Sequence, residues 1–335
     1  MAALAFDDAT LEEVRAFNRK LDRMPRFGMR YRRLARPLQM LMRLSQVGAD
    51  RRLARAGILA ETRRVGTGRV PVWVRILRPA AGPVRAVVLD IHGGGWVLGN
   101  ARMDDQLNQA MIAACGVAVV SVDYRLATGT PLQGLMDDCL AAARWLLEDG
   151  LPDYAGLPVL FVGESAGAHL AAATLLRLQA WPALCARIAG AVLYYGVYDF
   201  SGTPSVRAAG PDTLVLDGPG MLPSLESLTP GLSEAERRRP PLSPLYGDLG
   251  GMPPALMFAC ERDALRDDTI TMAARWRAAI GNEDVERDPV ELHLLPEAPH
   301  GIIHFPLRMA QLVTARSHAW IRARIDAVAG ASLSY

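Results

Sequence analysis

Continuous apolar runs in the middle of the chain predict buried β-strands. Residues 85–91, 117–122 and 158–162 are almost uninterrupted valine, alanine, leucine, isoleucine and phenylalanine, as is typical of strands covered on both faces of a sheet. The stretch 166–178 is rich in alanine and leucine and has no internal proline, so it predicts a helix that follows the third run directly. Further strands are predicted at 70–77, 253–260 and 291–295, and a helix at the C-terminus.

Two segments with a different pattern lie outside this core. Residues 1 to about 60 are helix-like and rich in arginine, with a break at Pro37. We favour a cap packed on the core with solvated or paired arginines, and the alternative is an amphipathic surface that touches anionic lipid or an oily substrate. Residues 201–241 are dense in glycine, proline and serine and predict a second cap segment. The catalytic core would then comprise 61–200 and 242–335.

Composition excludes several classes of function. Half of the 335 residues are hydrophobic, which suits one large α/β core and a cap, and a net charge of +2 gives no general attraction to nucleic acid. No membrane span or secretory signal is visible, and Gly66-Thr67-Gly68 predicts a turn, not a phosphate loop. Four cysteines lack metal spacing and predict buried thiols: Cys115, Cys139, Cys185 and Cys260. We expect a cytoplasmic protein without metal, cofactor or stable membrane anchor.

Two glycine-rich motifs follow predicted strands and belong to one chemistry. Gly163-Glu164-Ser165-Ala166-Gly167 is a G-x-S-x-G pattern, which places a serine on a sharp strand-to-helix turn. His92-Gly93-Gly94-Gly95-Trp96 can aim bare backbone N–H groups at a developing oxyanion. Ser165 would also lie at a helix N-terminus, where the dipole favours negative charge. Together the motifs predict a serine hydrolase of the α/β-hydrolase type.

A serine nucleophile needs a histidine base, which follows it in the chain in this fold. Of the six histidines, His92 precedes the serine and His169 lies in the helix that begins after it. His293 lies in an alternating strand and His318 in the C-terminal helix. His300 follows a strand in a loop, where a triad histidine belongs, whereas His304 would fall at the start of the next helix as a supporting or capping residue.

The acid that orients this histidine should lie after the strand at 253–260. Asp263 has the right loop position, with Glu261 as its rival. Asp267 and Asp268 fit the first turn of the next helix, where carboxylates complement the helix dipole.

With these residues the chain resembles the hormone-sensitive-lipase-like family of bacterial carboxylesterases. The resemblance runs from about residue 70 to the C-terminus, and it rests on residues 92–96, 123–127, 163–167, 243–268 and 300–301. It implies an α/β-hydrolase fold, a mostly parallel eight-stranded sheet flanked by helices with a helical cap. It further implies metal-free hydrolysis of small to medium acyl esters through an acyl-enzyme. In that reaction Ser165 is the nucleophile, His300 the base and Asp263 the acid, and the oxyanion hole comprises the N–H groups of Gly93, Gly94 and Ala166. Supporting or substrate-lining residues would be His92, Gly95, Trp96 and Glu164.

The sequence departs from the family pattern in three places that remove no catalytic group, and the first and third of them concern substrate choice. The run 125–131 lacks the usual proline and glutamate, Glu164 stands where aspartate is more frequent, and Ile302 replaces phenylalanine. Asp123 and Arg125 are interpreted as a charged pair that fixes a loop.

The alternatives that remain open are an amidase or lactonase with the same triad, transfer of the acyl group to another alcohol, and a non-catalytic small-molecule receptor on this scaffold. Receptors on this scaffold typically lose a triad residue, whereas Ser165, Asp263 and His300 are all present. A homodimer through the last strand and the C-terminal helix is implied by the resemblance alone.

Overall fold

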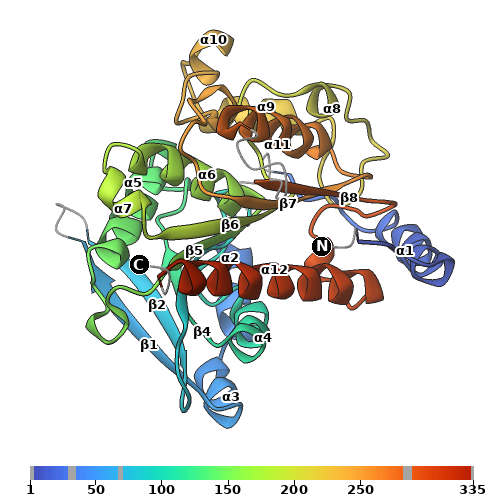
Figure 1. Cartoon of the computed structure of the whole chain (residues 1–335). Helices are drawn as coiled ribbons and strands as arrows, with labels where there is room; N and C mark the ends of the chain where they lie inside the picture. The colour runs from blue at the N-terminus through green and yellow to red at the C-terminus, as the bar shows by residue number, and fades with distance from the viewer. Residues whose placement is uncertain (1–3, 29–34, 67–70, 282–288, 333–335) are drawn as a thin grey trace.

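An eight-stranded sheet forms the centre of the molecule (Figure 1). The computed structural model describes residues 4–28, 35–66, 71–281 and 289–332. The strand order is β1-β2-β4-β3-β5-β6-β7-β8, in which β2 pairs antiparallel with β1 and β4 and the other neighbours are parallel. The strands are β1 Ile58–Val65, β2 Val72–Pro79, β3 Ala86–Ile91, β4 Val117–Asp123, β5 Val159–Glu164, β6 Ile188–Tyr194, β7 Ala255–Cys260 and β8 Val290–Leu295. The mostly parallel eight-stranded sheet predicted from the sequence is confirmed.

The burial of the central strands explains why several of them could be predicted from apolar runs in the sequence. Every residue of β3, β5, β6 and β7 is buried, because helices cover both faces of the sheet. At the sheet edge β1 has only its two terminal residues fully buried. Ser165 follows β5 near the middle of the sheet, where the flanking strands β3 and β6 shield the turn on both sides.

Two layers of helices enclose the sheet. Helices α5 (Leu132–Leu147), α6 (Ala166–Leu178) and α11 (Arg266–Ile280) share one hydrophobic core. Helices α1 (Asp8–Leu21), α3 (Ala49–Arg55), α4 (Asp105–Cys115) and α12 (Arg308–Ser332) contribute to the core on the opposite face. The remaining helices are α2 Ala35–Ser45, η2 Pro152–Tyr154, α7 Pro182–Cys185, α8 Pro204–Arg207, α9 Met221–Leu228, α10 Glu234–Arg237, η3 Pro244–Tyr246 and η4 Ile302–His304.

The two segments predicted as a cap meet through backbone hydrogen bonds. The Phe27 N–H donates to the Val215 carbonyl at 2.6 Å, and the Asp217 N–H donates to the Phe27 carbonyl at 2.8 Å. In contrast, α1 packs against α12, on the side of the core. The division into caps 1–60 and 201–241 and a core of 61–200 and 242–335 therefore stays a prediction, and it is best supported for the part of the N-terminal segment around Phe27.

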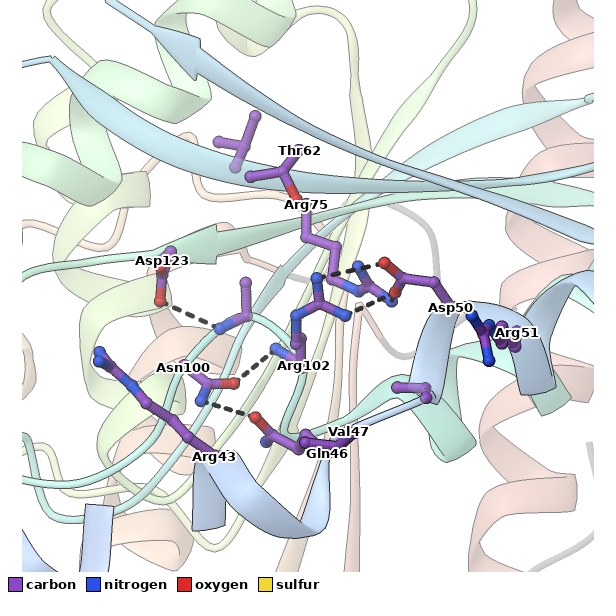
Figure 2. Close-up of a pocket in the computed structure, with 14 residues that line it drawn as sticks. Arg43, Gln46, Val47, Asp50, Arg51, Thr62, Arg75, Asn100, Arg102 and Asp123 are labelled. Atoms are coloured by element: carbon purple, nitrogen blue, oxygen red, sulfur yellow. Dashed lines mark hydrogen bonds and ion pairs between the residues drawn. The ribbon is translucent and has the colours of Figure 1, made fainter. Parts of the chain in front are cut away.

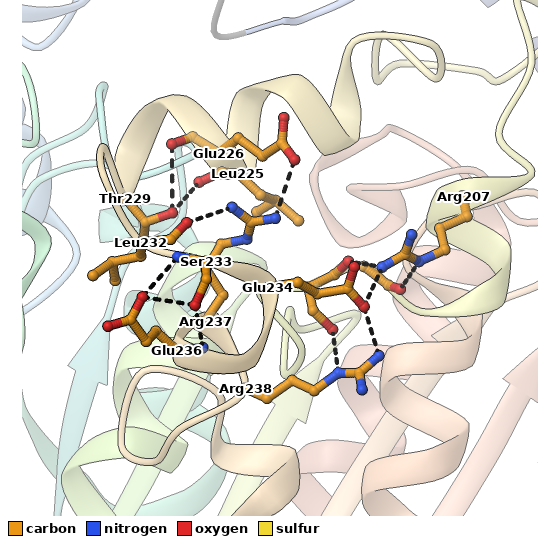
Figure 3. A network of polar contacts seen from close by, with 12 residues as sticks. Arg207, Leu225, Glu226, Thr229, Leu232, Ser233, Glu234, Glu236, Arg237 and Arg238 are labelled. Atoms are coloured by element: carbon orange, nitrogen blue, oxygen red, sulfur yellow. Dashed lines mark hydrogen bonds and ion pairs between the residues drawn. The ribbon is translucent and has the colours of Figure 1, made fainter.

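Arginine–glutamate pairs hold the second cap segment together (Figure 3). Glu234 of α10 accepts from Arg207 at 3.0 Å and from Arg238 at 2.8 Å. Arg237 reaches back to Glu226 of α9 at 3.1 Å. These pairs link the three short helices α8, α9 and α10, so Arg207, Arg237 and Arg238 are paired and not simply solvated.

A polar network ties α2 and α3 to the segment that follows the glycine-rich loop (Figure 2). Asp50 accepts from Arg75 at 2.7 Å and from Arg102 at 2.5 Å, and Arg75, which is 2 % exposed, also donates to Asp105 at 2.8 Å. Asn100 donates to Gln46, the residue that follows α2, at 2.9 Å. This network lines a polar hollow of about 700 Å³ that does not include Ser165.

Several smaller sequence predictions can be compared with the structure. Asp123 and Arg125 do not pair with each other: Asp123 accepts the Ala101 N–H, whereas Arg125 binds Asp138 at 2.7 Å. The predicted pairing is therefore wrong, because the chain turns after β4 and directs the guanidinium to α5. None of the described helices is long and apolar enough to cross a membrane. Parts of three predictions lie outside the described residues: Thr67 and Gly68 of the turn, Val70 of the strand, and Arg30, Arg32 and Arg33 of the N-terminal segment.

Candidate active site

Ser165 lies on a strained turn between β5 and α6. Its φ of 54° and ψ of −119° are unusual for a residue with a side chain, a strain of about 1–3 kcal/mol that the packing around it must offset. The two glycines of the motif let the turn close. A Cβ on Gly163 would lie 2.6 Å from the Gly167 carbonyl oxygen, and one on Gly167 only 1.8 Å from that of Ile91. The turn therefore packs directly on β3, which leads into the glycine-rich loop.

A hydrogen-bonded relay connects Ser165 to a buried carboxylate. His300 Nε2 lies 2.9 Å from Ser165 Oγ, and its Nδ1 lies 2.7 Å from Asp263 Oδ2. The Asp263 side chain is fully buried, and its second oxygen accepts the Leu265 N–H at 3.0 Å. Burial opposes protonation of His300, but Asp263 and, to a smaller extent, Glu164 favour it, so the pKa of the imidazole lies above its usual value. The structure thus brings together the three residues proposed as a triad.

The rival acids lie elsewhere. Glu261 is exposed and accepts the Glu297 N–H at 2.7 Å. Asp267 pairs with Arg266 in the first turn of α11, as its position predicted. Asp268 is buried and accepts hydrogen bonds from Thr203 and from the Tyr198 and Asp199 N–H groups, and burial raises its pKa to about 7.

The glycine-rich loop differs from the sequence prediction in one donor. The Gly93 N–H donates to Glu164 Oε1 at 3.0 Å, and Gly94, Gly95 and Trp96 line the pocket over Ser165 whereas Gly93 does not. Gly94 and Gly95 both have positive φ, 94° and 59°. The geometry therefore does not offer Gly93 as an oxyanion donor, because a carboxylate already occupies its N–H.

His92 packs behind the glycine-rich loop and is not among the residues that line the pocket. It is buried, which lowers its pKa, and its ring stacks on Tyr124 with centroids 4.2 Å apart. The Tyr124 hydroxyl donates to the His92 and Gly93 carbonyls at 2.9 and 3.0 Å. A Cβ at Gly99 would lie 2.3 Å from His92 Nδ1, so the chain closes tightly over the ring.

Trp96 forms part of the pocket wall and is held by His169. Its Nε1–H donates to His169 Nδ1 at 3.1 Å, and His169 Nε2 lies 2.9 Å from the Leu242 carbonyl. Burial lowers the pKa of His169 to about 4, so this imidazole is neutral. With Nδ1 accepting, Nε2 carries the proton and donates to Leu242, and both ring nitrogens are satisfied.

A largely apolar pocket of about 570 Å³ opens over Ser165. Its walls come from α2, through Leu38, Leu41 and Met42, and from the second cap segment, through Val215, Leu216 and Met221. Glu164, His300 and His304 are the titratable residues among those that line it. Such a pocket fits an uncharged organic molecule.

One set of side chains in the described residues has the chemistry of metal ligands. Donor atoms of Asp104, Glu164 and His304 all lie within 4.8 Å of one another. Two carboxylates and an imidazole could hold a divalent cation, but Glu164 already accepts from Gly93 and pairs with His304. No step proposed below needs a metal.

Comparisons with known proteins agree with this geometry. A family model for the alpha/beta hydrolase fold matches residues 88–304. Carboxylesterase NlhH of Mycobacterium tuberculosis is 34% identical over 243 residues, which cover 70% of this chain and 74% of that protein. Carboxylic ester hydrolase LipN of the same species is 32% identical over 254 residues, 71% of this chain and 62% of that protein. The solved structure of a bacterial heroin esterase superposes with a TM-score of 0.77 at 26% identity, over 94% of this chain and 97% of that one. The chain therefore belongs to the hormone-sensitive-lipase-like family of α/β hydrolases, as its motifs predicted.

Proposed function

We propose that this protein is a serine carboxylesterase that hydrolyses uncharged esters through an acyl-enzyme. The observation that carries the proposal is the Ser165–His300–Asp263 relay, with distances of 2.9 and 2.7 Å, at the base of an apolar pocket. The names of the relatives, carboxylesterase and carboxylic ester hydrolase, support the same reaction. A receptor on this scaffold would not need the three side chains in hydrogen-bond contact.

The first half of the reaction begins at Ser165. His300 takes the hydroxyl proton through Nε2 as Oγ attacks the ester carbonyl. Asp263 keeps the second ring proton on Nδ1 and stabilises the imidazolium. The imidazolium then protonates the departing alkoxide, and the acyl group stays on Ser165. In the second half, water donates a proton to His300 as its oxygen attacks the acyl carbonyl. The bond between the acyl carbon and Ser165 Oγ then breaks, the imidazolium returns the proton to Oγ, and the acid is released.

We assign the oxyanion hole to the N–H groups of Gly94, Gly95 and Ala166. Gly94 and Gly95 line the pocket beside Ser165, and Ala166 is the first residue of α6, whose free N–H groups favour an anion. Each such donor lowers the barrier by about 3 kcal/mol, since it is already aimed where the charge develops. This assignment has Gly95 as a donor in place of Gly93, which was predicted from the sequence.

The shape and polarity of the pocket predict the substrate class. About 570 Å³ fits a small to medium acyl chain with a modest alcohol. Because α2 and the second cap segment supply mainly leucine, valine and methionine, a charged acid or alcohol would lose its hydration without gaining a partner. We therefore expect neutral esters of short and medium chains to be preferred.

Hydrolysis of p-nitrophenyl esters across acyl lengths, compared between the wild type and Ser165→Ala, tests the proposal. The wild type should turn over, and the variant should lose several orders of magnitude in kcat, because deletion of a nucleophile removes the whole covalent pathway. Matched amides, lactones and alcohol acceptors in the same assay test the alternative acyl transfers. If the folded wild type hydrolysed none of these compounds, the proposal would be contradicted. The alternative of a non-catalytic small-molecule receptor would then be favoured.

A further inference from the structure

A single buried carboxylate connects three parts of the site. Glu164 precedes Ser165, and its side chain is 8% exposed. Its Oε1 accepts the Gly93 N–H at 3.0 Å, and the same oxygen lies 3.5 Å from His304 Nε2. The nucleophile turn, the glycine-rich loop and η4 therefore converge on one atom.

The charges of this group are mutually dependent. Burial disfavours the Glu164 carboxylate, but the hydrogen bond and charge of His304 keep its pKa below the usual value. Burial also disfavours the His304 imidazolium, yet Glu164, Asp104 and Asp90 raise its pKa to about 9. At neutral pH the pair is thus ionised, and Glu164 presents a charged acceptor to Gly93, which makes a stronger bond than a neutral one.

The position of Gly93 matters because it leads into the proposed oxyanion donors. Gly94 and Gly95, the next two residues, have positive φ, so the direction of their N–H groups depends on where Gly93 is held. On the other side of Gly93, the Tyr124 hydroxyl bonds its carbonyl at 3.0 Å. Glu164 thus supplies the bond that fixes the loop on the side of the nucleophile.

We propose that His304 is a positioning residue for ester hydrolysis: it pairs with Glu164, which holds Gly93 and so aims the Gly94 and Gly95 N–H groups at the oxyanion. This inference rests on the proposed function. His304 also lines the pocket, but the proposed effect passes through Glu164 and not through a contact with substrate.

The arrangement has a pH signature on the alkaline side. The ionisable groups that act on His304 are Glu164, Asp104, Asp90 and His300. Burial raises the pKa of Asp104 well above its usual value. As pH rises through about 9, His304 loses its charge, Glu164 loses its partner, and kcat should fall.

The experiment compares His304→Gln, Glu164→Gln and the double variant with the wild type. Each glutamine keeps a hydrogen-bonding group but removes the charge. We expect kcat to fall about 10- to 100-fold in each single variant, as for a small misplacement of reacting groups, with KM changed less than about twofold. The alkaline decline should disappear in both, and the double variant should be no slower than the worse single one, because the residues act as one unit.

Three results would overturn the inference: an unchanged kcat in His304→Gln, an effect on KM alone, or an alkaline decline that survives in the variants. Ser165→Ala tests ester hydrolysis separately. If the wild type is active and His304→Gln has the same kcat, the positioning role of His304 is refuted while the proposed hydrolysis stands. If the wild type hydrolysed no ester, amide hydrogen exchange at Gly93 would still show whether His304 helps to hold the Gly93 N–H. Faster exchange in a folded His304→Gln supports the positioning role, and unchanged exchange refutes it.

Discussion

Asp263 has two physical effects on His300 that one substitution can separate. Its carboxylate accepts from Nδ1 at 2.7 Å, which fixes the tautomer, and its charge raises the pKa of the imidazole. The base works only when it is neutral, so activity should rise with pH through a midpoint above the ordinary histidine value of about 6.5.

Asp263→Asn should therefore lower kcat by about 10⁴-fold, since the asparagine favours the wrong tautomer. The midpoint of the acid limb should also move to lower pH, because the charge that favoured the imidazolium is gone. Residual rates from pH 5 to 9 measure both effects, with thermal unfolding to verify the fold. A midpoint that stays in place would show that Asp263 does not set the pKa of His300.

At the scale of single residues, the sequence pointed to Ser165, His300 and Asp263, which the structure places in hydrogen-bond contact, because each chemical role has a fixed place in chain order. It did not distinguish Gly93 from Gly95. All three glycines can adopt the required backbone, and only the fold shows that Glu164 occupies the Gly93 N–H. The pairing of His304 with Glu164 was also beyond the sequence, because it joins residues 140 positions apart whose spacing carries no pattern.

Among the elements, helix α2 forms the wall between the pocket and solvent. Leu38, Leu41 and Met42 line the pocket, and Leu38 and Leu41 are also exposed to solvent, as are Met40 and Leu44. The helix is fastened by Gln39, whose amide donates to the Gly99 carbonyl at 2.8 Å and accepts the Gly99 N–H at 3.0 Å.

Gln39→Ala should loosen this wall without disturbing the core. We expect KM for medium-chain esters to rise several-fold with little change in kcat, because the triad does not touch α2, and the free energy of unfolding to fall by about 1–2 kcal/mol for two lost hydrogen bonds. Gln133→Ala, an exposed glutamine of α5 that bonds only to Asp137, is the matched control. An unchanged KM profile across acyl lengths would contradict a role for α2 in binding.

Most strands were predicted because their apolar runs reflect burial on both faces. The runs at 85–91, 117–122 and 158–162 correspond closely to β3, β4 and β5. Strand β1 was not located, because arginine, glutamate and threonine interrupt it at the sheet edge. Strand β6 is wholly buried, but three small residues, Ala189, Gly190 and Ala191, interrupt its run of larger apolar side chains, so its pattern is weaker. A Cβ at Gly190 would lie 2.5 Å from the Trp320 ring, a constraint imposed by α12 that no local pattern contains.

For the whole molecule, stability and activity should respond to pH in opposite directions near neutrality. Burial raises the pKa of Asp268 to about 7, whereas an unfolded aspartate titrates near 3.9. The folded protein then binds this proton more tightly than the unfolded chain. The stability that this proton contributes is complete below about pH 4 and is lost as pH rises to about 7. The neutral form of His300, on which activity depends, forms above the ordinary histidine value of about 6.5.

Asp268→Asn should flatten this dependence, because asparagine has no proton to lose and its amide can still accept the Tyr198 and Asp199 N–H groups. Denaturant unfolding of both proteins at pH 5 and pH 8 gives the comparison. The wild type should lose more unfolding free energy than the variant between the two values. Equal losses would mean that Asp268 is already ionised at pH 5.

The bridge between Phe27 and the Val215–Asp217 segment has a consequence for the order in which the protein matures. One side of the pocket combines Phe27, which is made early in synthesis, with the Val215–Asp217 segment, which is made nearly two hundred residues later. The base, His300, is made later still. While the chain emerges from the ribosome, Ser165 is therefore made before its pocket wall and its base are complete. A nascent or truncated chain should therefore be unable to hydrolyse cellular esters. Ser165 becomes reactive toward esters only when its binding pocket and its base are complete.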